Sequence, residues 1–532
     1  MVTHSSHASR RTLPAVEADT SRASRPHNPT PKSLSELSAS FSLTPPETEL
    51  MFTGITLASS LVQQGDIYVA VPGTRFHGAQ FVSEAIARGA LAIITDAVGA
   101  EQLVNASVPV LTAPVDPREI LGLMAAWTYD TDRDRPPMFG LTGTNGKTST
   151  AHFLEAILAQ LGLRVGLSST AERRAGSEVL PSVLTTPESP EMHALLARMR
   201  EVDVEAIVIE VSAHALTRHR VDGLMFDVVG FTNLSHDHLD DYASMDDYLA
   251  AKISLFQPDR ARSAIVCLDT EAGQRVVDAA GIPVSTISSR DDVTADWFVD
   301  IGMESPAATE FTLVSERHGS LTTKVPLIGR HMAANAGLAI AMLVEAGFAL
   351  EDIAGVLTRD HGIRVSVPGR STRIPVEHGP AVIVDSGHSP DAFAKLLEAA
   401  RRVTPGKVIM VAGANGNRDT TKRTEMGQVS AIGSDILIVT DHHPRDEDPA
   451  NIRRALLEAA RDARPDGDIR EIADPADAIR VAVSAADADD TVVWAGLAGK
   501  DYREIAGEKI AFSVEGETRG ALHEAGWTLS DD

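Results

Sequence analysis

The chain has 532 residues, 43% of them hydrophobic, and a formal charge of −26 from 48 basic and 74 acidic side chains. A surface this acidic repels nucleic acid and anionic lipid, and no apolar run reaches the roughly 18 residues of a membrane-spanning helix. The length suggests about three domains. A single cysteine, Cys267, excludes an internal disulfide, so we expect a cytoplasmic protein.

The first part of the chain divides into a tail and an N-terminal domain. Residues 1–48 are rich in Ser, Thr, Pro, Arg and His and lack the apolar segment of a signal peptide. We expect a disordered tail, because the segment has little apolar surface to bury. Residues 49–134 are expected to form an α/β domain, with strands at 66–72 and 90–96 and a helix at 79–89.

The middle of the chain, residues 135–367, predicts a parallel sheet. A strand at 138–141 leads through a glycine-rich turn into a helix at 148–161. Two further runs, 206–211 and 228–231, are apolar at consecutive positions, which is typical of strands buried on both faces. The apolar run around Cys267 is expected to be another strand.

The last part, residues 368–532, alternates strand and helix patterns. The expected strands and helices are 381–385, 392–402, 408–412, 436–440, 451–463 and 491–495. This alternation predicts a doubly wound, Rossmann-like α/β domain.

The sequence GLTGTNGKT at 140–148 lies between the expected strand and helix of the middle domain. Glycines there let backbone N–H groups surround a phosphate, while Lys147 supplies charge and the Thr148 hydroxyl can bind Mg²⁺. The strict phosphate-loop pattern has glycine where this chain has Leu141, and a chance GKT in a loop is the alternative. We therefore predict an α/β protein of three domains, with a central P-loop ATPase-type parallel sheet and a C-terminal Rossmann-like domain.

The loop TGTNGKT resembles the ATP loop of the Mur ligases and of their relatives, the folylpolyglutamate synthetases. The resemblance extends to the motif at 329–335 and to the boundary at 367–370. It implies ATP as substrate, Mg²⁺ as cofactor, and an ATP site formed by Gly143, Thr144, Asn145, Gly146, Lys147, Thr148, Ser149, Asn335 and Arg370.

Two motifs are similar to those of the Mur ligases that extend UDP-N-acetylmuramoyl dipeptide: TTPE at 185–188 and EVSAHAL at 210–216. They imply that Glu210 is a catalytic Mg²⁺ ligand, and a glutamate ending a parallel strand also lies where open α/β sheets bind ligands. The residues implied to hold the UDP-sugar peptide are Thr185, Thr186, Ser212, Arg218 and Arg220, with Ser59, Thr74, Arg75 and Phe76 from the first domain.

Two more residues are implied to be catalytic. His238, in FTNLSHDHLD at 231–240, would bind Mg²⁺; the alternative is a polar loop that caps a helix. Lys252 stands at the family's spacing from Arg220, where the relatives have a carbamylated lysine; the alternative is a plain surface lysine on a helix.

The C-terminal domain departs from the family at the expected amino-acid site. The implied residues there are Arg418, His442, His443, Arg445, Gly496 and Lys500. HHPR at 442–445 replaces the Asp-Asn-Pro-Arg of diaminopimelate ligases, and Lys500 replaces a glutamate that contacts the distal ammonium. We expect a diamino acid that is recognised differently: diaminopimelate, L-lysine or a shorter homologue.

The resemblance implies an ATP-dependent ligase for peptidoglycan precursors, in which D-glutamate of UDP-N-acetylmuramoyl-L-alanyl-D-glutamate is joined to a free amino acid. We expect a monomer with neither a nucleic-acid nor a membrane partner. Two alternatives stay open. One is another amino-acid ligase of the folylpolyglutamate type, which lacks counterparts of GDIYVA at 65–70 and of TTPE; the other is a catalytically degenerate nucleotide-binding protein.

Overall fold

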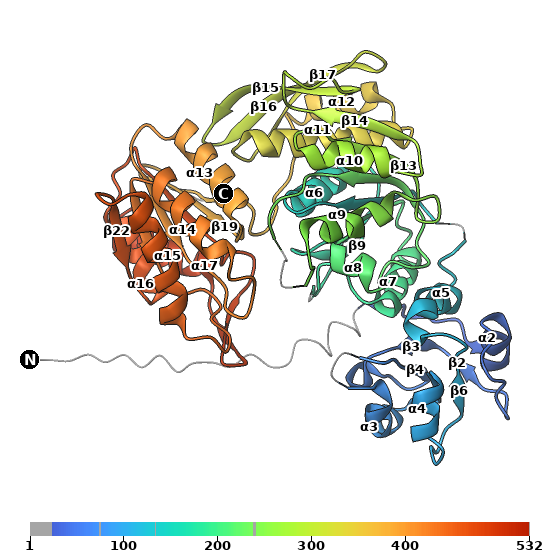
Figure 1. Ribbon diagram of the computed structural model, residues 1–532. Helices are drawn as coiled ribbons and strands as arrows, with labels where there is room; N and C mark the ends of the chain where they lie inside the picture. The colour runs from blue at the N-terminus through green and yellow to red at the C-terminus, as the bar shows by residue number, and fades with distance from the viewer. Residues whose placement is uncertain (1–23, 74–75, 134, 183, 238–240, 531–532) are drawn as a thin grey trace, which may run out of the picture.

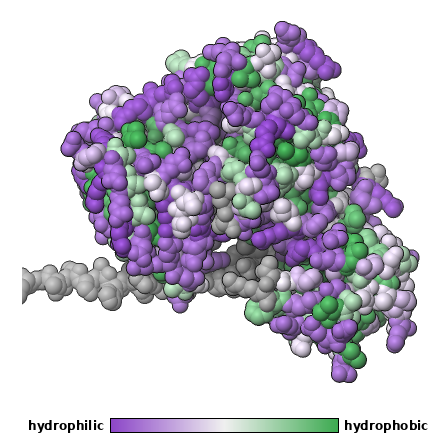
Figure 2. Space-filling view, viewed as in Figure 1, coloured by the Kyte–Doolittle hydropathy of each residue, from purple (hydrophilic) through white to green (hydrophobic). Residues whose placement is uncertain are grey.

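The structure is a computed structural model that describes residues 24–73, 76–133, 135–182, 184–237 and 241–530. The chain forms three α/β units in sequence order, with the first at one end of the central unit and the third beside the central unit (Figure 1). The face seen in Figure 2 is mainly hydrophilic, with hydrophobic side chains in scattered groups. No helix within the described ranges is long and apolar enough to cross a membrane.

The first unit is built on a four-stranded parallel sheet in the order β3–β4–β5–β6. Helix α3 packs on one face, and α2 and α5 pack on the other. The elements are β3 (Gly54–Thr56), η1 (Ser59–Leu61), β4 (Asp66–Ala70), η2 (Gly78–Phe81), α3 (Val82–Ala87), β5 (Ala92–Thr95), α4 (Ala97–Gln102), β6 (Val110–Thr112) and α5 (Pro117–Tyr129).

The segment that precedes this sheet is folded, so the prediction of a disordered tail up to residue 48 is wrong for residues 24–48. Strand β1 (Lys32–Ser33) pairs with β2 (Met51–Phe52), and α2 (Leu34–Ser40) buries Leu34 and Leu37 in the domain core. Few apolar residues are needed in this segment, because the rest of the domain supplies their apolar partners. The expected start of the first domain at residue 49 is therefore too late.

The central unit is an 11-stranded sheet in the order β10–β9–β8–β11–β7–β12–β13–β14–β15–β16–β17. The expected parallel sheet is present as the run β8–β11–β7–β12–β13–β14–β15. These strands are β7 (Met138–Thr142), β8 (Val165–Ser168), β11 (Ala206–Glu210), β12 (Phe226–Phe231), β13 (Ala261–Cys267), β14 (Val284–Ser288) and β15 (Trp297–Ser305).

Antiparallel strands extend both ends of this sheet, which a purely parallel prediction missed. They are β9 (Arg173–Ala175), β10 (Glu178–Leu180), β16 (Ala308–Ser315) and β17 (Gly319–Val325). Helices α6 (Lys147–Gln160), α11 (Arg330–Glu345) and α12 (Leu350–Arg359) cover one face. The other face and the strand ends hold α7 (Ser189–Glu201), α8 (Ala213–Thr217), α9 (Met245–Ile253), η3 (Ser254–Phe256) and α10 (Glu271–Ala279).

The third unit is a doubly wound, six-stranded sheet in the order β18–β19–β23–β20–β21–β22, parallel except for the edge strand β18. Its strands are β18 (Thr372–Ile374), β19 (Ala381–Asp385), β20 (Val408–Ala412), β21 (Ile436–Val439), β22 (Asp468–Glu471) and β23 (Thr491–Ala495). One face packs on α13 (Pro390–Val403), α14 (Lys422–Gly433) and α15 (Pro449–Ala463). The other packs on α16 (Pro475–Ser484) and α17 (Val514–Glu524).

Candidate active site

The phosphate loop follows β7 and ends at the first turn of α6. Gly143 and Gly146 have φ values of 145° and 90°, which L side chains rarely adopt. A Cβ on Gly143 would collide with the Thr232 hydroxyl, and one on Gly146 would lie 2.7 Å from the Asn335 side chain. Asn335, one of the predicted ATP-site residues, is thus packed on the loop.

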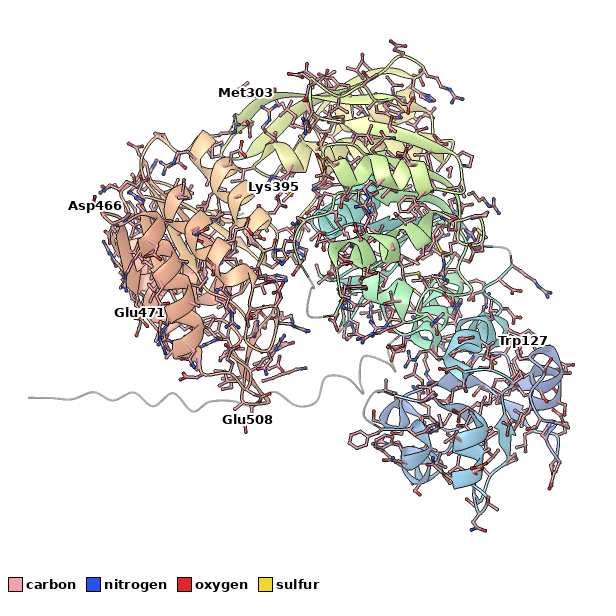
Figure 3. All side chains as sticks on the ribbon, viewed as in Figure 1. Trp127, Met303, Lys395, Asp466, Glu471 and Glu508 are labelled. Carbon is pink, nitrogen blue, oxygen red and sulfur yellow. The ribbon has the colours of Figure 1, made fainter. Side chains whose placement is uncertain are left out.

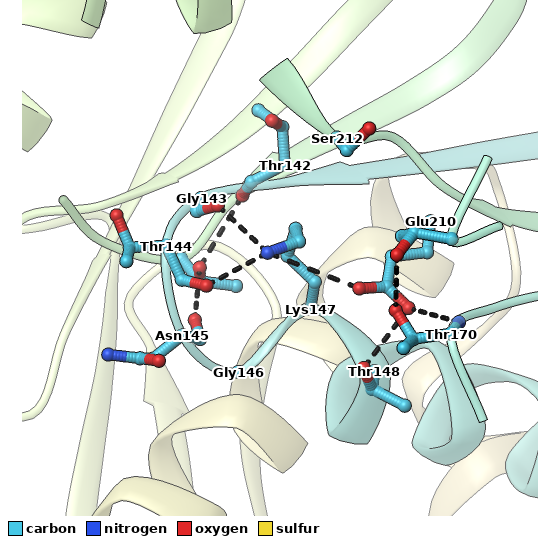
Figure 4. A network of polar contacts seen from close by, with 12 residues as sticks. Thr142, Gly143, Thr144, Asn145, Gly146, Lys147, Thr148, Thr170, Glu210 and Ser212 are labelled. Carbon is cyan, nitrogen blue, oxygen red and sulfur yellow. Dashed lines mark hydrogen bonds and ion pairs between the residues drawn. The ribbon is translucent and has the colours of Figure 1, made fainter. Parts of the chain in front are cut away.

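Lys147 begins α6 and turns back over the loop (Figure 4). Its Nζ donates to the carbonyl oxygens of Gly143 and Thr144 at 3.0 and 2.8 Å and lies 4.0 Å from Glu210 Oε1. Burial lowers the pKa of Lys147, and the Glu210 carboxylate opposes that shift. The ammonium therefore lies where it can move from loop carbonyls to a bound phosphate.

Glu210, at the end of β11, joins the loop to the rest of the site. Its Oε2 accepts from the Thr148 hydroxyl at 3.1 Å and from the Thr170 N–H at 2.8 Å (Figure 4). A hydroxyl and a carboxylate are the hard oxygen donors that Mg²⁺ prefers. Within the described residues no group of three or more His, Cys, Asp or Glu side chains is arranged to hold a metal ion. His238 lies outside the described residues.

Lys252 is buried on α9 beneath the loop, so it is not the surface lysine of the alternative hypothesis. Its Nζ donates to the Gly143 carbonyl oxygen at 2.8 Å and lies 4.0 Å from the Tyr248 ring centre. Burial and then the nearby Lys147 hold the pKa of Lys252 well below its usual value. A lysine in this setting is readily neutral, which is the form that reacts with carbon dioxide.

The two motifs assigned to the sugar-peptide side meet beside Glu210. The Thr186 hydroxyl donates to the Glu210 carbonyl oxygen at 2.8 Å and accepts from the Ser212 N–H at 3.1 Å. Arg220 donates to the Thr186 carbonyl oxygen at 3.3 Å. Thr185 is next to this group and accepts from Thr170, whereas Arg218 is half-exposed and 3.9 Å from Asp241.

The first domain reaches this group through α5. Arg118 lies 3.2 Å from Glu188, and the same carboxylate pairs with Arg220 at 2.9 Å. Sequence analysis did not single out Arg118. Of the residues it assigned to the first domain, Ser59 donates to Glu84 at 2.7 Å and Phe76 is exposed beside Phe81. Thr74 and Arg75 lie outside the described residues.

The C-terminal domain contacts the loop from the opposite side. Arg370 donates to the Thr148 hydroxyl at 3.2 Å and also to Ser386. Two further contacts cross the same boundary: Asn145 donates to Asp391 at 2.8 Å, and Lys422 pairs with Asp237 at 3.0 Å in a largely buried ion pair. Sequence analysis assigned no role to Asp237, because its spacing pointed instead to the adjacent histidine.

A cavity of about 370 Å³ lies between α11 and α13, next to the loop. Its walls include Asn233, His331, Asn335 and Lys395. Burial lowers the pKa of His331 to about 4, so this side chain is neutral at pH 7. The cavity is partly apolar, and charged side chains such as Asp391 and Lys395 also line it. A partly apolar cavity beside a phosphate loop suits a nucleobase and ribose. Ser149, the last predicted ATP-site residue, is buried in the first turn of α6.

The predicted amino-acid residues gather at the ends of β21 and β23. The buried His442 ring packs so closely on Gly496, which has a φ of 107°, that a Cβ there would collide with it. His443 Nδ1 accepts from the Glu504 N–H at 3.0 Å, and burial lowers the pKa of His443 to about 3. Arg445 pairs with Glu504 at 3.1 Å, while Arg418 and Lys500 are exposed.

This fold and this site define a three-domain phosphate-loop enzyme with a cavity between the central and C-terminal domains, next to the loop. Family models match the chain at residues 51–129 (Mur ligase family, catalytic domain), 141–343 (Mur ligase middle domain) and 369–497 (Mur ligase, glutamate ligase domain). The chain belongs to the Mur ligase family and is an ATP-dependent ligase that forms C–N bonds.

Similar proteins cover nearly the whole chain. A UDP-N-acetylmuramyl-tripeptide synthetase from Leifsonia xyli subsp. xyli is 52% identical over 95% of this chain and 98% of its own length. A UDP-N-acetylmuramoyl-L-alanyl-D-glutamate–2,6-diaminopimelate ligase from Streptomyces avermitilis is 38% identical over 91% and 95%. A solved 2,6-diaminopimelate ligase of the same name matches with a TM-score of 0.63, 26% identity, and coverage of 93% and 100%.

Proposed function

We propose that this ligase joins a diamino acid to the D-glutamate of UDP-N-acetylmuramoyl-L-alanyl-D-glutamate, as part of peptidoglycan precursor synthesis. The similar proteins are named for this substrate or for its tripeptide product. The family model for the first domain also matches, which favours a UDP-sugar substrate over the folate substrates of the folylpolyglutamate type.

One observation supports the proposal most directly: side chains of the first and C-terminal domains reach the central domain, the first at Glu188 and the other at the phosphate loop. The first domain contributes Arg118 through Glu188, and the C-terminal domain contributes Arg370 at the Thr148 hydroxyl. A reaction with three substrates requires such a junction, because the reacting groups must be held within a few ångströms of one another.

The reaction follows from the chemistry of a carboxylate. Its carbon is a poor electrophile, so one of its oxygens first attacks the γ-phosphorus of ATP, ADP leaves, and an acyl phosphate forms. The amine of the incoming amino acid then attacks the acyl carbon, and inorganic phosphate leaves with the C–O bond electrons. Lys147 neutralises charge on the transferring phosphoryl group, while Arg220 and Ser212 are placed to hold the acceptor peptide.

The loop also fits the proposed Mg²⁺ cofactor. Thr148 and Glu210 present two oxygen donors 3.1 Å apart, and Mg²⁺ held there would supply charge neutralisation for the phosphates. Lys252 Nζ donates to the same Gly143 carbonyl oxygen as Lys147, and a carbamate on this neutral amine would place an anion next to the loop. The low pKa of Lys252 supports this modification, since carbamate formation requires the neutral amine.

We further propose a monomeric enzyme of the cytoplasm. The one cysteine, Cys267, lies in β13, where burial raises the pKa of its thiol to about 12, so the chain has no reactive thiol that an oxidising compartment would pair.

The test combines purified enzyme, ATP, Mg²⁺, UDP-N-acetylmuramoyl-L-alanyl-D-glutamate and a mixture of diamino acids. Mass spectrometry should find a UDP-N-acetylmuramoyl tripeptide, and ADP release should require both the peptide and an amino acid. Lys147→Ala serves as the inactive control. ADP release that proceeds equally with a folate in place of the nucleotide sugar would contradict the proposal.

A further inference from the structure

A hairpin near the C-terminus is attached to the loop that follows β21. The hairpin consists of β24 (Tyr502–Ile505) and β25 (Glu508–Ala511). The Glu504 N–H donates to His443 Nδ1 at 3.0 Å, the Arg445 N–H donates to the Glu504 carbonyl oxygen at 3.1 Å, and the Ala506 N–H donates to the Arg445 carbonyl oxygen at 2.8 Å. These bonds hold Glu504 directly over Arg445.

The Glu504 side chain uses this position to bind the Arg445 guanidinium. Glu504 Oε2 accepts from Arg445 Nε at 3.1 Å, and an Nη of the same guanidinium donates to the Gly416 carbonyl oxygen at 3.1 Å. Arg445 also has a φ of 53°, a conformation that costs energy and persists where the surroundings fix it. The guanidinium is therefore fixed and already has a carboxylate partner.

Two further cations, Lys500 and Arg418, lie near the pair of Arg445 and Glu504. Within the described part of the chain, neither Lys500 nor Arg418 has a carboxylate partner; Lys500 lies 5.5 Å from the Tyr502 ring centre. Desolvation by the surrounding protein atoms and then Arg445 lower the pKa of Lys500, while Glu504 opposes this shift. A cation in this state gains from an anionic ligand, and the α-carboxylate of an amino acid meets that requirement.

The second carboxylate oxygen of Glu504, Oε1, is available to bind a ligand. None of the hydrogen bonds in the described ranges uses Glu504 Oε1, and the residue is only partly exposed. His443 is neutral and uses Nδ1 as an acceptor, so it carries its proton on Nε2 and presents no acceptor for an ammonium on that side. Glu504 Oε1 is thus an acidic acceptor beside Arg445 that can receive a second ammonium.

We infer that the Glu504 carboxylate binds Arg445 in the place of a side-chain carboxylate of the incoming amino acid. The enzyme therefore selects a diamino acid that has only one carboxylate. Lys500 and Arg418 bind the α-carboxylate, and Glu504 Oε1 binds the side-chain ammonium. This inference rests on the proposed function and names the class of its amino acid. It differs from the 2,6-diaminopimelate, with two carboxylates, in the names of several relatives.

The experiment is a competition in one reaction. Equal concentrations of diaminopimelate, L-lysine, L-ornithine and L-2,4-diaminobutyrate compete for UDP-N-acetylmuramoyl-L-alanyl-D-glutamate, and mass spectrometry measures the product ratio, which does not depend on the fraction of active enzyme. Wild type should favour a monocarboxylate acid over diaminopimelate by about tenfold or more, as expected for a charged group left without its partner. Glu504→Gln and Glu504→Ala should shift the ratio about tenfold towards diaminopimelate, because Arg445 is then free.

Two controls make the result specific. Glu508, at the outer end of the same hairpin, is exposed (Figure 3), so Glu508→Gln should leave the ratio unchanged. Adding Arg445→Ala to Glu504→Gln should abolish the gain for diaminopimelate. A wild-type preference for diaminopimelate, or a ratio that ignores Glu504, would overturn the inference and leave the proposed function standing. No tripeptide product from any of the four acids would overturn both.

Discussion

The phosphate loop and the proposed amino-acid pocket lie on neighbouring domains, yet they depend on sequence in different ways. In the loop, Gly143, Lys147 and Thr148 lie within a few residues of one another, and their spacing alone fixes a turn that holds phosphate. In the pocket, Arg445 is matched by Glu504, which a separate hairpin supplies. Local motifs reveal the first kind of site, whereas the second requires the tertiary structure.

The two sites differ in this way because their ligands are recognised by different kinds of protein groups. A phosphate is bound by backbone N–H groups and one cation. Few loop sequences provide this arrangement, and those that do share a recognisable motif. An amino-acid side chain is recognised by charge and shape, which different residues from different elements can supply. We therefore expect substitutions in the loop to abolish catalysis, and substitutions in the pocket to change which amino acid is used.

The largest expected effect is in the loop. Lys147→Ala should reduce kcat by about 10³-fold, equivalent to about 4 kcal/mol, because a charge that stabilises the transferring phosphoryl group is lost. Steady-state ADP release measures the effect, and circular dichroism should show an unchanged fold. A variant that keeps more than about a tenth of the wild-type rate would mean that the loop does not bind ATP in this way.

Lys252→Ala should reduce kcat by about 10²-fold or more, because the proposed carbamate anion next to Gly143 is lost. Short carboxylic acids such as formate or acetate should restore part of the rate by entering the vacated space. Lys407→Ala, at an exposed lysine of the C-terminal domain, is the matched control. Wild-type activity of Lys252→Ala without added acid would remove Lys252 from the catalytic machinery.

On the pocket side, Gly496→Ala should raise the KM for the amino acid by about tenfold while changing the KM for ATP little, because the added methyl displaces His442. Gly347→Ala is a close control, since Gly347 has a φ of 97° but a methyl added there would have no neighbour within 4 Å. Equal effects of the two substitutions on the amino-acid KM would show that backbone strain, and not the contact with His442, is responsible.

A comparison of stability, and not of activity, uses one buried histidine from each region. Burial lowers the pKa of His152 in α6 and of His443 in the pocket to about 3. Below a pH of about 6.5 the unfolded chain takes up a proton at each histidine and the folded chain does not, so stability falls as pH falls towards 3, by about 2 kcal/mol per histidine at pH 5.

Thermal unfolding between pH 7.5 and 5 measures this dependence. His152→Asn and His443→Asn should each reduce the slope of stability against pH by a similar amount. This expectation does not depend on how each substitution changes the stability at pH 7.5. The exposed His523 in α17 provides a control substitution, which should leave the slope unchanged. A slope that responds to His443 but not to His152 would show that the two regions do not unfold together.

The sequence predicted most strands of the three sheets and the residues that surround Glu210, because these depend on apolar runs and on short motifs. It did not predict the antiparallel ends of the central sheet, where short alternating strands such as β16 give a weaker pattern. It also missed the fold of residues 24–48. There Arg25 makes a bidentate ion pair with buried Asp66 at 2.6 and 2.8 Å, a pairing between positions far apart in the chain.

In the candidate active site, too, some features could be predicted from the sequence and others required the structure. Glycine spacing and Lys147 were sufficient to predict the ATP loop, while the ion pair of Lys422 with Asp237 and the contact of Arg118 with Glu188 could not be read from either partner alone. Each joins two domains, and a pattern within one segment contains no information about which surfaces will meet. The resemblance implied a catalytic role for Lys252. The structure adds the physical setting, in which Lys252 is buried against the Gly143 carbonyl oxygen.

The position of β23 has a consequence for how the protein is made. This strand, Thr491–Ala495, lies between β19 and β20, although it is synthesised long after both. The first two domains therefore emerge from the ribosome before the C-terminal sheet is complete. Until β23 is made, the strands β18–β19 and β20–β22 form two separate halves with open edges. Open strand edges favour aggregation, so a nascent chain stalled before residue 491 should be a substrate for chaperones.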